Sequence, residues 1–300
     1  MKICVPVLLV LSALCAGAQG PQNGRGPVLR VDANLVLVPV TVTDRRGSVV
    51  PNLSREDFVL SEEKQRQGII SFSHEIAPIS LGIVVDLSGS MEKKIAKVQV
   101  AVRAILDNLE PEDEEFLETF ADTPELRLQF TSQTSEIHDA LMFARPGGNT
   151  ALYDAVALAA NQMRWAQNGR KVLFLISDGG DNHSRFTERE LRRLLDERDV
   201  QIHAIGIHDN MGGWEAVRGP RVLEELASMT GGQYHMVNNM SELPALASEM
   251  SLALHDRYLL GYKPTPPGLS GEFRRIDVKL AQPKHSPGRY LYARRGYRMP

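Results

Sequence analysis

The sequence predicts an α/β fold in which a doubly wound, mostly parallel sheet is flanked by a small β-sandwich formed from the N- and C-terminal strands. Two observations lead to this prediction. Between residues 80 and 256, apolar strand-like runs alternate with helix-like segments, whereas residues 29–77 and 257–300 show strand-like patterns only. Strands that alternate with helices form parallel sheets covered on both faces. We therefore expect an α/β core inserted between the two halves of a β module.

The beginning of the chain has the pattern of a targeting signal. Met1 and Lys2 precede an apolar stretch over 3–14, and the small residues of 16–18 suit a signal peptidase. The stretch is shorter than the ~20 apolar residues of a membrane helix, so we expect a signal peptide over 1–18 and no transmembrane segment. The protein is then exported, to the periplasm or outside the cell. Residues 19–28, rich in Gly, Gln and Asn, are expected to form a disordered leader.

The first half of the β module is expected over 29–77. Apolar residues alternate with smaller or polar ones up to Val42, and the Gly-containing turn 44–47 follows. Alternation with period two that ends in such a turn is typical of a strand opening a hairpin. Shorter strands are expected over 53–60 and 68–73.

The α/β core is expected over 80–256. Its strands are predicted at 81–86, 116–120, 126–130, 171–178, 200–207 and 233–237. Its helices are predicted at 95–109, 135–144, 152–163, from Thr187 onward, 221–229 and 241–255. The second and third strands are separated by a short turn, so they should pair antiparallel at a sheet edge. Thr187 and Glu190 have the spacing of a capping box, which marks the start of a helix.

The second half of the β module is expected over 257–300. Strands are predicted at 257–262, 274–280 and 288–294. They would pair with the N-terminal strands, so the chain would cross between base and core twice.

Five oxygen-bearing side chains follow strands of the core or lie in loops that enter helices. They are Asp86, Ser88, Ser90, Thr150 and Asp178. In doubly wound sheets, ligands bind at the carboxyl ends of the strands, where the strand order reverses. Carboxylates and small hydroxyls are ligands for hard cations such as Mg²⁺. We therefore predict one cation site at this edge.

The residues that carry this prediction resemble a known family. The Asp86-x-Ser88-x-Ser90 motif, Thr150 within Gly-Gly-Asn-Thr, and Asp178 within Ile-Ser-Asp-Gly are similar to the metal-ion-dependent adhesion site of von Willebrand factor type A domains. The resemblance runs from about residue 29 to residue 298, and the flanking segments resemble a secreted bacterial subfamily. It implies that the hydroxyls of the serines and the threonine contact the ion, while the two carboxylates act mainly through bound waters or, in some states of the family, more directly.

The resemblance also implies a function. We expect a non-enzymatic protein-binding module whose divalent cation, Mg²⁺ with Mn²⁺ or Ca²⁺ as alternatives, is completed by an Asp or Glu of a protein partner. A structural component of a cell-envelope assembly, in which the ion only braces loops, is the alternative. Each site residue also has a local interpretation: Ser90 and Thr150 as helix caps, and Asp178 as a turn former. Asp154 and Asp181 are interpreted as local capping or neighbouring groups.

Other function classes fit the sequence less well. The formal net charge of −3, or −4 once Lys2 is removed with the signal, argues against binding to nucleic acid. Ser90 and Lys93 match the start of a serine acylase motif, but its companion segments are missing. A Gly-rich phosphate loop with lysine and a His-Glu-x-x-His motif are also missing. We therefore expect no catalytic activity.

Overall fold

The computed structural model describes residues 35–207, 214–281 and 288–299. The strands are β1 (Val36–Thr43), β2 (Phe58–Glu62), β3 (Gln65–Gln67), β4 (Ile69–Ile76), β5 (Ile79–Asp86), β6 (Glu114–Phe120), β7 (Pro124–Thr131), β8 (Arg170–Ser177), β9 (Gln201–Ile207), β10 (Tyr234–Val237), β11 (Asp256–Tyr262), β12 (Phe273–Leu280), β13 (Tyr290–Ala293) and β14 (Gly296–Arg298). The α-helices are α1 (Ile95–Leu106), α2 (Thr134–Met142), α3 (Leu152–Gln162), α4 (Glu188–Asp196), α5 (Trp214–Thr230) and α6 (Leu243–Leu252), and the 3₁₀ turns are η1 (Arg55–Asp57), η2 (Gly89–Met91) and η3 (Met163–Trp165).

The α/β core is built on a six-stranded sheet in the order β10-β9-β8-β5-β6-β7. All neighbours pair in parallel except β6 and β7, which are antiparallel at the edge. The chain runs from β5 outward to β7 and then returns to β8 on the other side of β5. The strand order therefore reverses between β5 and β8, so the carboxyl ends of these two strands form the switch point of the sheet.

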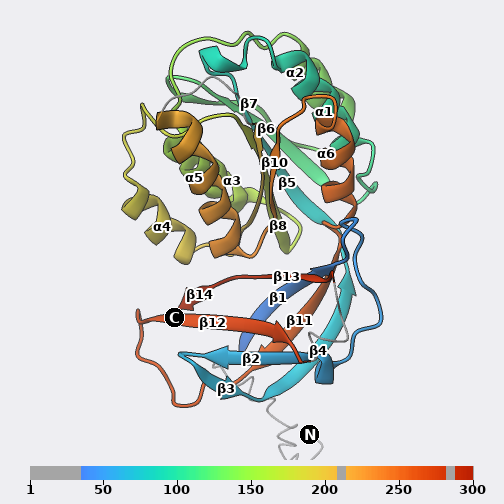
Figure 1. The fold of residues 1–300 in the computed structure, drawn as a ribbon, viewed down its shortest axis with the longest axis vertical. Helices are drawn as coiled ribbons and strands as arrows, with labels where there is room; N and C mark the ends of the chain where they lie inside the picture. The colour runs from blue at the N-terminus through green and yellow to red at the C-terminus, as the bar shows by residue number, and fades with distance from the viewer. Residues whose placement is uncertain (1–34, 208–213, 282–287, 300) are drawn as a thin grey trace, which may run out of the picture. The chain divides into compact units, whose positions relative to one another are not determined.

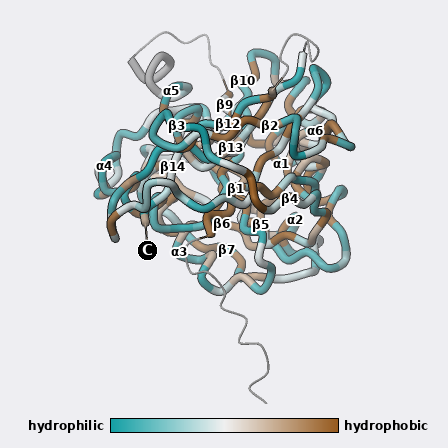
Figure 2. Tube along the Cα trace, turned by 90° about the horizontal axis from the view of Figure 1, so that it is seen from below, coloured by the Kyte–Doolittle hydropathy of each residue, from teal (hydrophilic) through white to brown (hydrophobic). Residues whose placement is uncertain are grey.

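Two apolar clusters cover the two faces of this sheet. One joins alternate residues of β5, such as Ile83, to α1, α2 and α6, and the other joins Val84 and its neighbours to α3, α4 and α5. Figure 1 shows the two helix layers on opposite sides of the strands. Because β5 is covered on both faces, all eight of its residues are buried. Figure 2 colours the chain by hydropathy, and several brown segments lie near the middle of that view, where many strand labels are placed.

The β module consists of two four-stranded antiparallel sheets. Their orders are β13-β1-β11-β4 and β14-β12-β2-β3. A third apolar cluster lies between them and includes Val40, Phe58 and Tyr258. Since each sheet contains strands from both ends of the chain, the β-sandwich predicted from the N- and C-terminal segments is confirmed, as is the mostly parallel core sheet.

The strands that precede and follow the core pair with each other. Asp256 of β11 lies opposite Ile76 of β4, and the amide of Ala77 donates a hydrogen bond to the carbonyl of His255. The chain therefore enters and leaves the core at neighbouring points. The predicted boundaries at 77, 80 and 256 stay a prediction, because strand pairing alone does not show that either part folds independently.

Some details differ from the expectations. Helix α5 begins at Trp214, whereas the sequence predicted a helix that begins at Arg221. Pro220 therefore lies inside the helix, where it lacks one backbone donor. The short strands β3 and β14, with three residues each, have too few residues to show a period. The capping box at α4 forms, with Thr187 Oγ1 accepting from the amide of Glu190. The predicted signal peptide, the leader and the beginning of the first strand lie outside the described residues. Among those described, no helix is long and apolar enough to cross a membrane.

Strand β6 buries a carboxyl group without a counter-charge. Glu118 is fully buried on the face that also holds Phe116 and Phe120, and both its carboxyl oxygens lack a hydrogen-bond partner among the described residues. This burial raises the pKa of Glu118 to about 9. Glu118 is therefore neutral in the folded protein at pH 7 but charged in the unfolded chain.

Glu118 should make the protein less stable as the pH rises. A carboxyl group whose pKa is raised in the folded state contributes most to the free energy of unfolding when the pH is below its unfolded-state pKa. For Glu118 this contribution is lost as the pH rises from 4.5 to about 9. At about 1.4 kcal/mol per pH unit, the loss by pH 7 is on the order of 3 kcal/mol. Glu118→Gln removes this titration, so its melting temperature should fall less between pH 5 and pH 8 than that of the wild type. Glu112→Gln, at an exposed position, serves as the control. Parallel pH profiles for Glu118→Gln and the wild type would contradict this account.

Candidate metal centre

Asp86 is the last residue of β5 and is fully buried at the switch point. Its Oδ1 accepts a hydrogen bond of 2.8 Å from the amide of Ser88, and its Oδ2 accepts one of 2.5 Å from the hydroxyl of Ser177 at the end of β8. Burial raises the pKa of Asp86 to about 6, although the bonds from Ser177 and Ser88 act in the opposite direction. The nearby charge of Asp178 raises it further. A cation at this position would relieve both effects.

The two serines link Asp86 to Asp178. The Oγ atoms of Ser88 and Ser90 lie 3.1 Å apart, and Ser90 Oγ donates a 2.8 Å hydrogen bond to Asp178 Oδ1. Ser88 is the N-cap residue of η2 but its side chain makes no capping bond, and Ser90 lies within that turn. Both hydroxyls therefore face the site rather than the backbone, which argues against the interpretation of Ser90 as a simple helix cap.

Thr150 lies on a loop that is fastened to the Asp86 segment. The amide of Gly147 donates to the carbonyl of Leu87 at 2.7 Å, and the amide of Gly89 donates to the carbonyl of Gly148 at 3.0 Å. Thr150 is buried. A Cβ atom added to Gly179 would lie 3.9 Å from Oγ1 of Thr150, so the hydroxyl of Thr150 faces the turn after Asp178. The N-cap of α3 is Ala151, so Thr150 is not the cap of that helix.

Three further polar residues hold these loops. Oδ1 of Asp122 accepts from the amide and the side chain of Asn149, at 2.9 and 2.7 Å, which lowers the pKa of Asp122. Gly148 has φ +84°, and a Cβ there would lie 2.6 Å from the Asp122 carboxylate, so the close approach requires glycine. Asn182 Oδ1 accepts from the amide of Thr150 at 2.8 Å. The sequence interpretation missed Asp122, Asn149 and Asn182 because only the fold brings them to the site.

Asp154 and Asp181 are engaged in local hydrogen bonds. Asp154 accepts from the amides of Arg185 and Phe186, and Asp181 accepts from the amide of Tyr153 and the hydroxyl of Ser184. These contacts organise the loop after Asp178.

The arrangement suits an oxygen-preferring cation. Asp86, Ser88, Ser90 and Asp178 form one hydrogen-bonded chain, and the hydroxyl of Thr150 faces the turn after Asp178. Hydroxyl and carboxylate oxygens are typical ligands of Mg²⁺ and Ca²⁺. Within the described part of the chain, no group of three or more His, Cys, Asp or Glu side chains is placed to hold a metal. A metal in this edge of the sheet would therefore depend on hydroxyl oxygens as well as on the two carboxylates.

Comparison with known proteins agrees with the geometry. Residues 81–180, which include all five predicted site residues, match the family model of the von Willebrand factor type A domain. The chain contains a von Willebrand factor type A domain.

Solved structures agree on the fold of this type A domain. A von Willebrand factor type A protein from Catenulispora acidiphila superposes with a TM-score of 0.53 and 15% identity, over 81% of this chain and 73% of that one. Proximal thread matrix protein 1 from the mussel byssus, solved with a zinc-occupied metal-ion-dependent adhesion site motif, gives 0.51 and 19%, over 64% of this chain and 49% of that one. A comparison with curated proteins gave no match.

One residue of the type A domain that the sequence analysis did not predict at the site changes the electrostatics there. Lys94 is buried at the N-cap of α1, and its Nζ donates a 2.5 Å hydrogen bond to Asp178 Oδ2. Nothing in the sequence around Lys94, which follows the exposed Lys93, indicates that it is buried. One turn of chain after Ser90 brings the ammonium group to the carboxylate. Lys94 therefore neutralises one of the two acids that a metal would use.

Removing the Lys94 charge should strengthen metal binding. Lys94→Met keeps an unbranched side chain but frees Asp178 from its ion pair, so we expect the dissociation constant for Mg²⁺ to fall by about tenfold, equivalent to about 1.4 kcal/mol. Isothermal titration calorimetry measures the change. Lys93→Met is the matched control because Lys93 is exposed, and it should bind as the wild type does. Unchanged or weaker binding by Lys94→Met would show that Lys94 does not compete with the ion.

Proposed function

We propose that the type A domain binds a divalent cation through Asp86, Ser88, Ser90, Thr150 and Asp178, and uses this ion to bind a partner protein. The observation that carries the proposal is the chain of hydrogen bonds from Ser177 through Asp86, the two serines and Asp178. It places carboxylate and hydroxyl oxygens together at the switch point, where doubly wound sheets bind ligands.

The chemistry of the donors favours an acidic partner. Two carboxylates formally balance a divalent ion, but Lys94 already neutralises part of the charge of Asp178. The ion would therefore keep an affinity for a further anionic oxygen, which an Asp or Glu of the partner provides. Ser90 is exposed, so the ion would be within reach of another molecule. We propose Mg²⁺ as the ion, with Mn²⁺ and Ca²⁺ as alternatives.

The segment that leads to Thr150 supports a protein partner. Phe143 has 85% of its surface exposed and Met142 has 49%, and both precede the loop that is fastened to the Asp86 segment. Exposed large apolar side chains near a polar site are typical of protein interaction surfaces. We propose that they contact the partner around the ion.

Two other functions are less well supported. If the ion only braced loops within an envelope assembly, these loops would need it, yet backbone bonds, Asp122 and Asn182 already hold them. A serine acylase would need Lys93 as the base for Ser90, but the Ser90 hydroxyl donates to Asp178 instead and Lys93 is exposed. We therefore propose a non-enzymatic module, exported by the segment over 1–18 to the periplasm or outside the cell.

Ser90→Ala tests the metal site with little risk to the fold, because Ser90 is exposed. Wild-type protein should bind Mg²⁺ in calorimetry, with a dissociation constant on the order of 10⁻⁴ to 10⁻³ M, the range of extracellular calcium modules. Ser90→Ala should bind at least about tenfold more weakly, since even the loss of an outer contact typically costs 10–100-fold. Flat titrations of the wild type with Mg²⁺, Mn²⁺ and Ca²⁺ would end the proposal.

Partner binding is tested separately from metal binding. Proteins captured from an envelope extract by the wild type in Mg²⁺ should be lost in chelator and with Ser90→Ala. Phe143→Ala should capture less while its Mg²⁺ affinity stays unchanged. If chelator lowers the melting temperature but leaves capture intact, the ion braces the loops and the alternative function is correct.

A further inference from the structure

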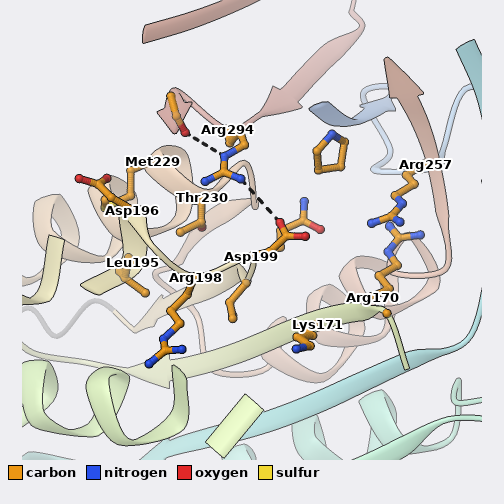
Figure 3. A pocket seen from close by; sticks show the side chains of 15 residues that line it. Arg170, Lys171, Leu195, Asp196, Arg198, Asp199, Met229, Thr230, Arg257 and Arg294 are labelled. Carbon is orange, nitrogen blue, oxygen red and sulfur yellow. Dashed lines mark hydrogen bonds and ion pairs between the residues drawn. The ribbon is translucent and has the colours of Figure 1, made fainter. Parts of the chain in front are cut away.

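A small cavity lies at the edge of the core sheet opposite to the candidate metal centre. Arg170, the first residue of β8, lines it together with Pro39 of β1, Arg257 of β11 and the end of α5. Because β8 ends at Ser177 beside Asp86, its first residue is at the other end of the sheet. Figure 3 shows the cavity with its cationic side chains.

The lining of this cavity has an excess of positive charge. Five cationic residues contribute to it: Arg170, Lys171, Arg198, Arg257 and Arg294. Only two acidic residues line it, Asp196 and Asp199, and they pair with Arg298 at 3.3 Å and with Arg294 at 3.6 Å.

Arg257 also has a partner. Its Nε and Nη2 each donate to Glu75 at 3.2 Å. Oδ1 of Asp256, the neighbouring acidic residue, lies 2.6 Å from Nε2 of His74. The carboxylates near the cavity are therefore engaged with groups other than Arg170.

Arg170 is the most deeply buried cation of this lining, and none of these contacts pairs it with a carboxylate. Its exposed fraction is 3%, and its Nε and Nη1 have no hydrogen-bond partner among the described residues. Its one hydrogen bond, from Nη2 to the carbonyl of Asp256, is long at 3.4 Å. Burial and the charge of Arg257 lower the pKa of Arg170 to about 9, against the attraction of Asp256 and Glu75. A buried cation with unused donors is costly unless it is paired.

The size of the cavity restricts what can pair with Arg170. About 20 Å³ is open to the centre of a water-sized molecule, and a single water needs about 10–15 Å³ on this measure. One or two atoms of that size fit beside Arg170. A water could accept hydrogen bonds from Arg170, but it would leave the charge uncompensated.

We propose that this cavity binds one monatomic anion of the size of chloride, held by the guanidinium groups of Arg170 and Arg257. Figure 3 shows these two groups next to each other, and the effect of Arg257 on Arg170 agrees with this placement. The anion accepts hydrogen bonds from the unused donors of Arg170. Since Arg170 belongs to the core and Arg257 to the β module, the anion links the core to the β module. This anion site is separate from the candidate metal centre.

Chloride titration tests the proposal. At constant ionic strength, replacing sodium gluconate by sodium chloride should raise the melting temperature of the wild type and then saturate. The rise should be about 2–4 °C once chloride is roughly tenfold above its dissociation constant. Arg170→Gln should lose this dependence, whereas Arg66→Gln, at an exposed position of β3, should keep it. Equal melting temperatures of the wild type in the two salts, or a chloride effect that persists in Arg170→Gln, would overturn the proposal.

A second measurement uses the wild-type protein and does not depend on the variant folding. Bromide replaces chloride in such sites and scatters anomalously, so crystals grown in sodium bromide should show an anomalous peak between Arg170 and Arg257. Absence of a peak there at high bromide concentration would refute the site. Both measurements are made in chelator, so they remain valid if the metal proposal fails.

Discussion

The burial of the Asp86 carboxylate is the constraint on which the candidate metal centre depends. The strand order reverses between β5 and β8, so the ends of these strands lie side by side and Asp86 meets Ser177. With no solvent to hydrate it, the carboxylate takes hydrogen bonds from Ser177 and from the amide of Ser88, and these set the direction of the loop that follows. The positions of the Ser88 and Ser90 hydroxyls, and the contact of Ser90 with Asp178, follow from the direction of this loop. The position of the acid in the sheet therefore determines the position of the other donors.

The pairing of β4 with β11 plays the same part for the β module. These strands flank the core in sequence and pair over Ile69–Ile76 and Asp256–Tyr262, so the two crossings of the chain are held together by backbone hydrogen bonds. The rest of the module pairs outward from them, with β1 beside β11. Backbone pairing depends little on side-chain identity, which allows a core of this size to be inserted without disrupting the sandwich.

Residues whose role follows from local pattern could be predicted from the sequence, and residues whose role follows from the fold could not. Asp86 ends an apolar run and Thr187 begins a capping box, so both carry their context in the neighbouring residues. Lys94, Asp122 and Arg170 act on groups 84, 27 and 86 positions away, respectively. Charged residues are mostly exposed, and nothing near Lys94 or Arg170 in the sequence indicates that they are buried. Asp122 is exposed, and only the fold brings it to the amide of Asn149. The predicted cation site therefore contained the oxygen donors that the fold brings together but lacked Lys94, which pairs with Asp178.

The two ends of β8 have opposite electrostatic requirements. Arg170 begins the strand beside an excess of positive charge, and Ser177 ends it beside the carboxylates of Asp86 and Asp178. Eight residues of strand, at about 3.3 Å per residue, separate the two ends by roughly 23 Å. This exceeds the screening length of about 8 Å at physiological salt, although screening is weaker within the protein than in water. Direct attraction between an anion at one end and a cation at the other is therefore small. Any coupling between the two ions would have to pass through a displacement of β8, which the tightly packed layers on both faces of the sheet resist.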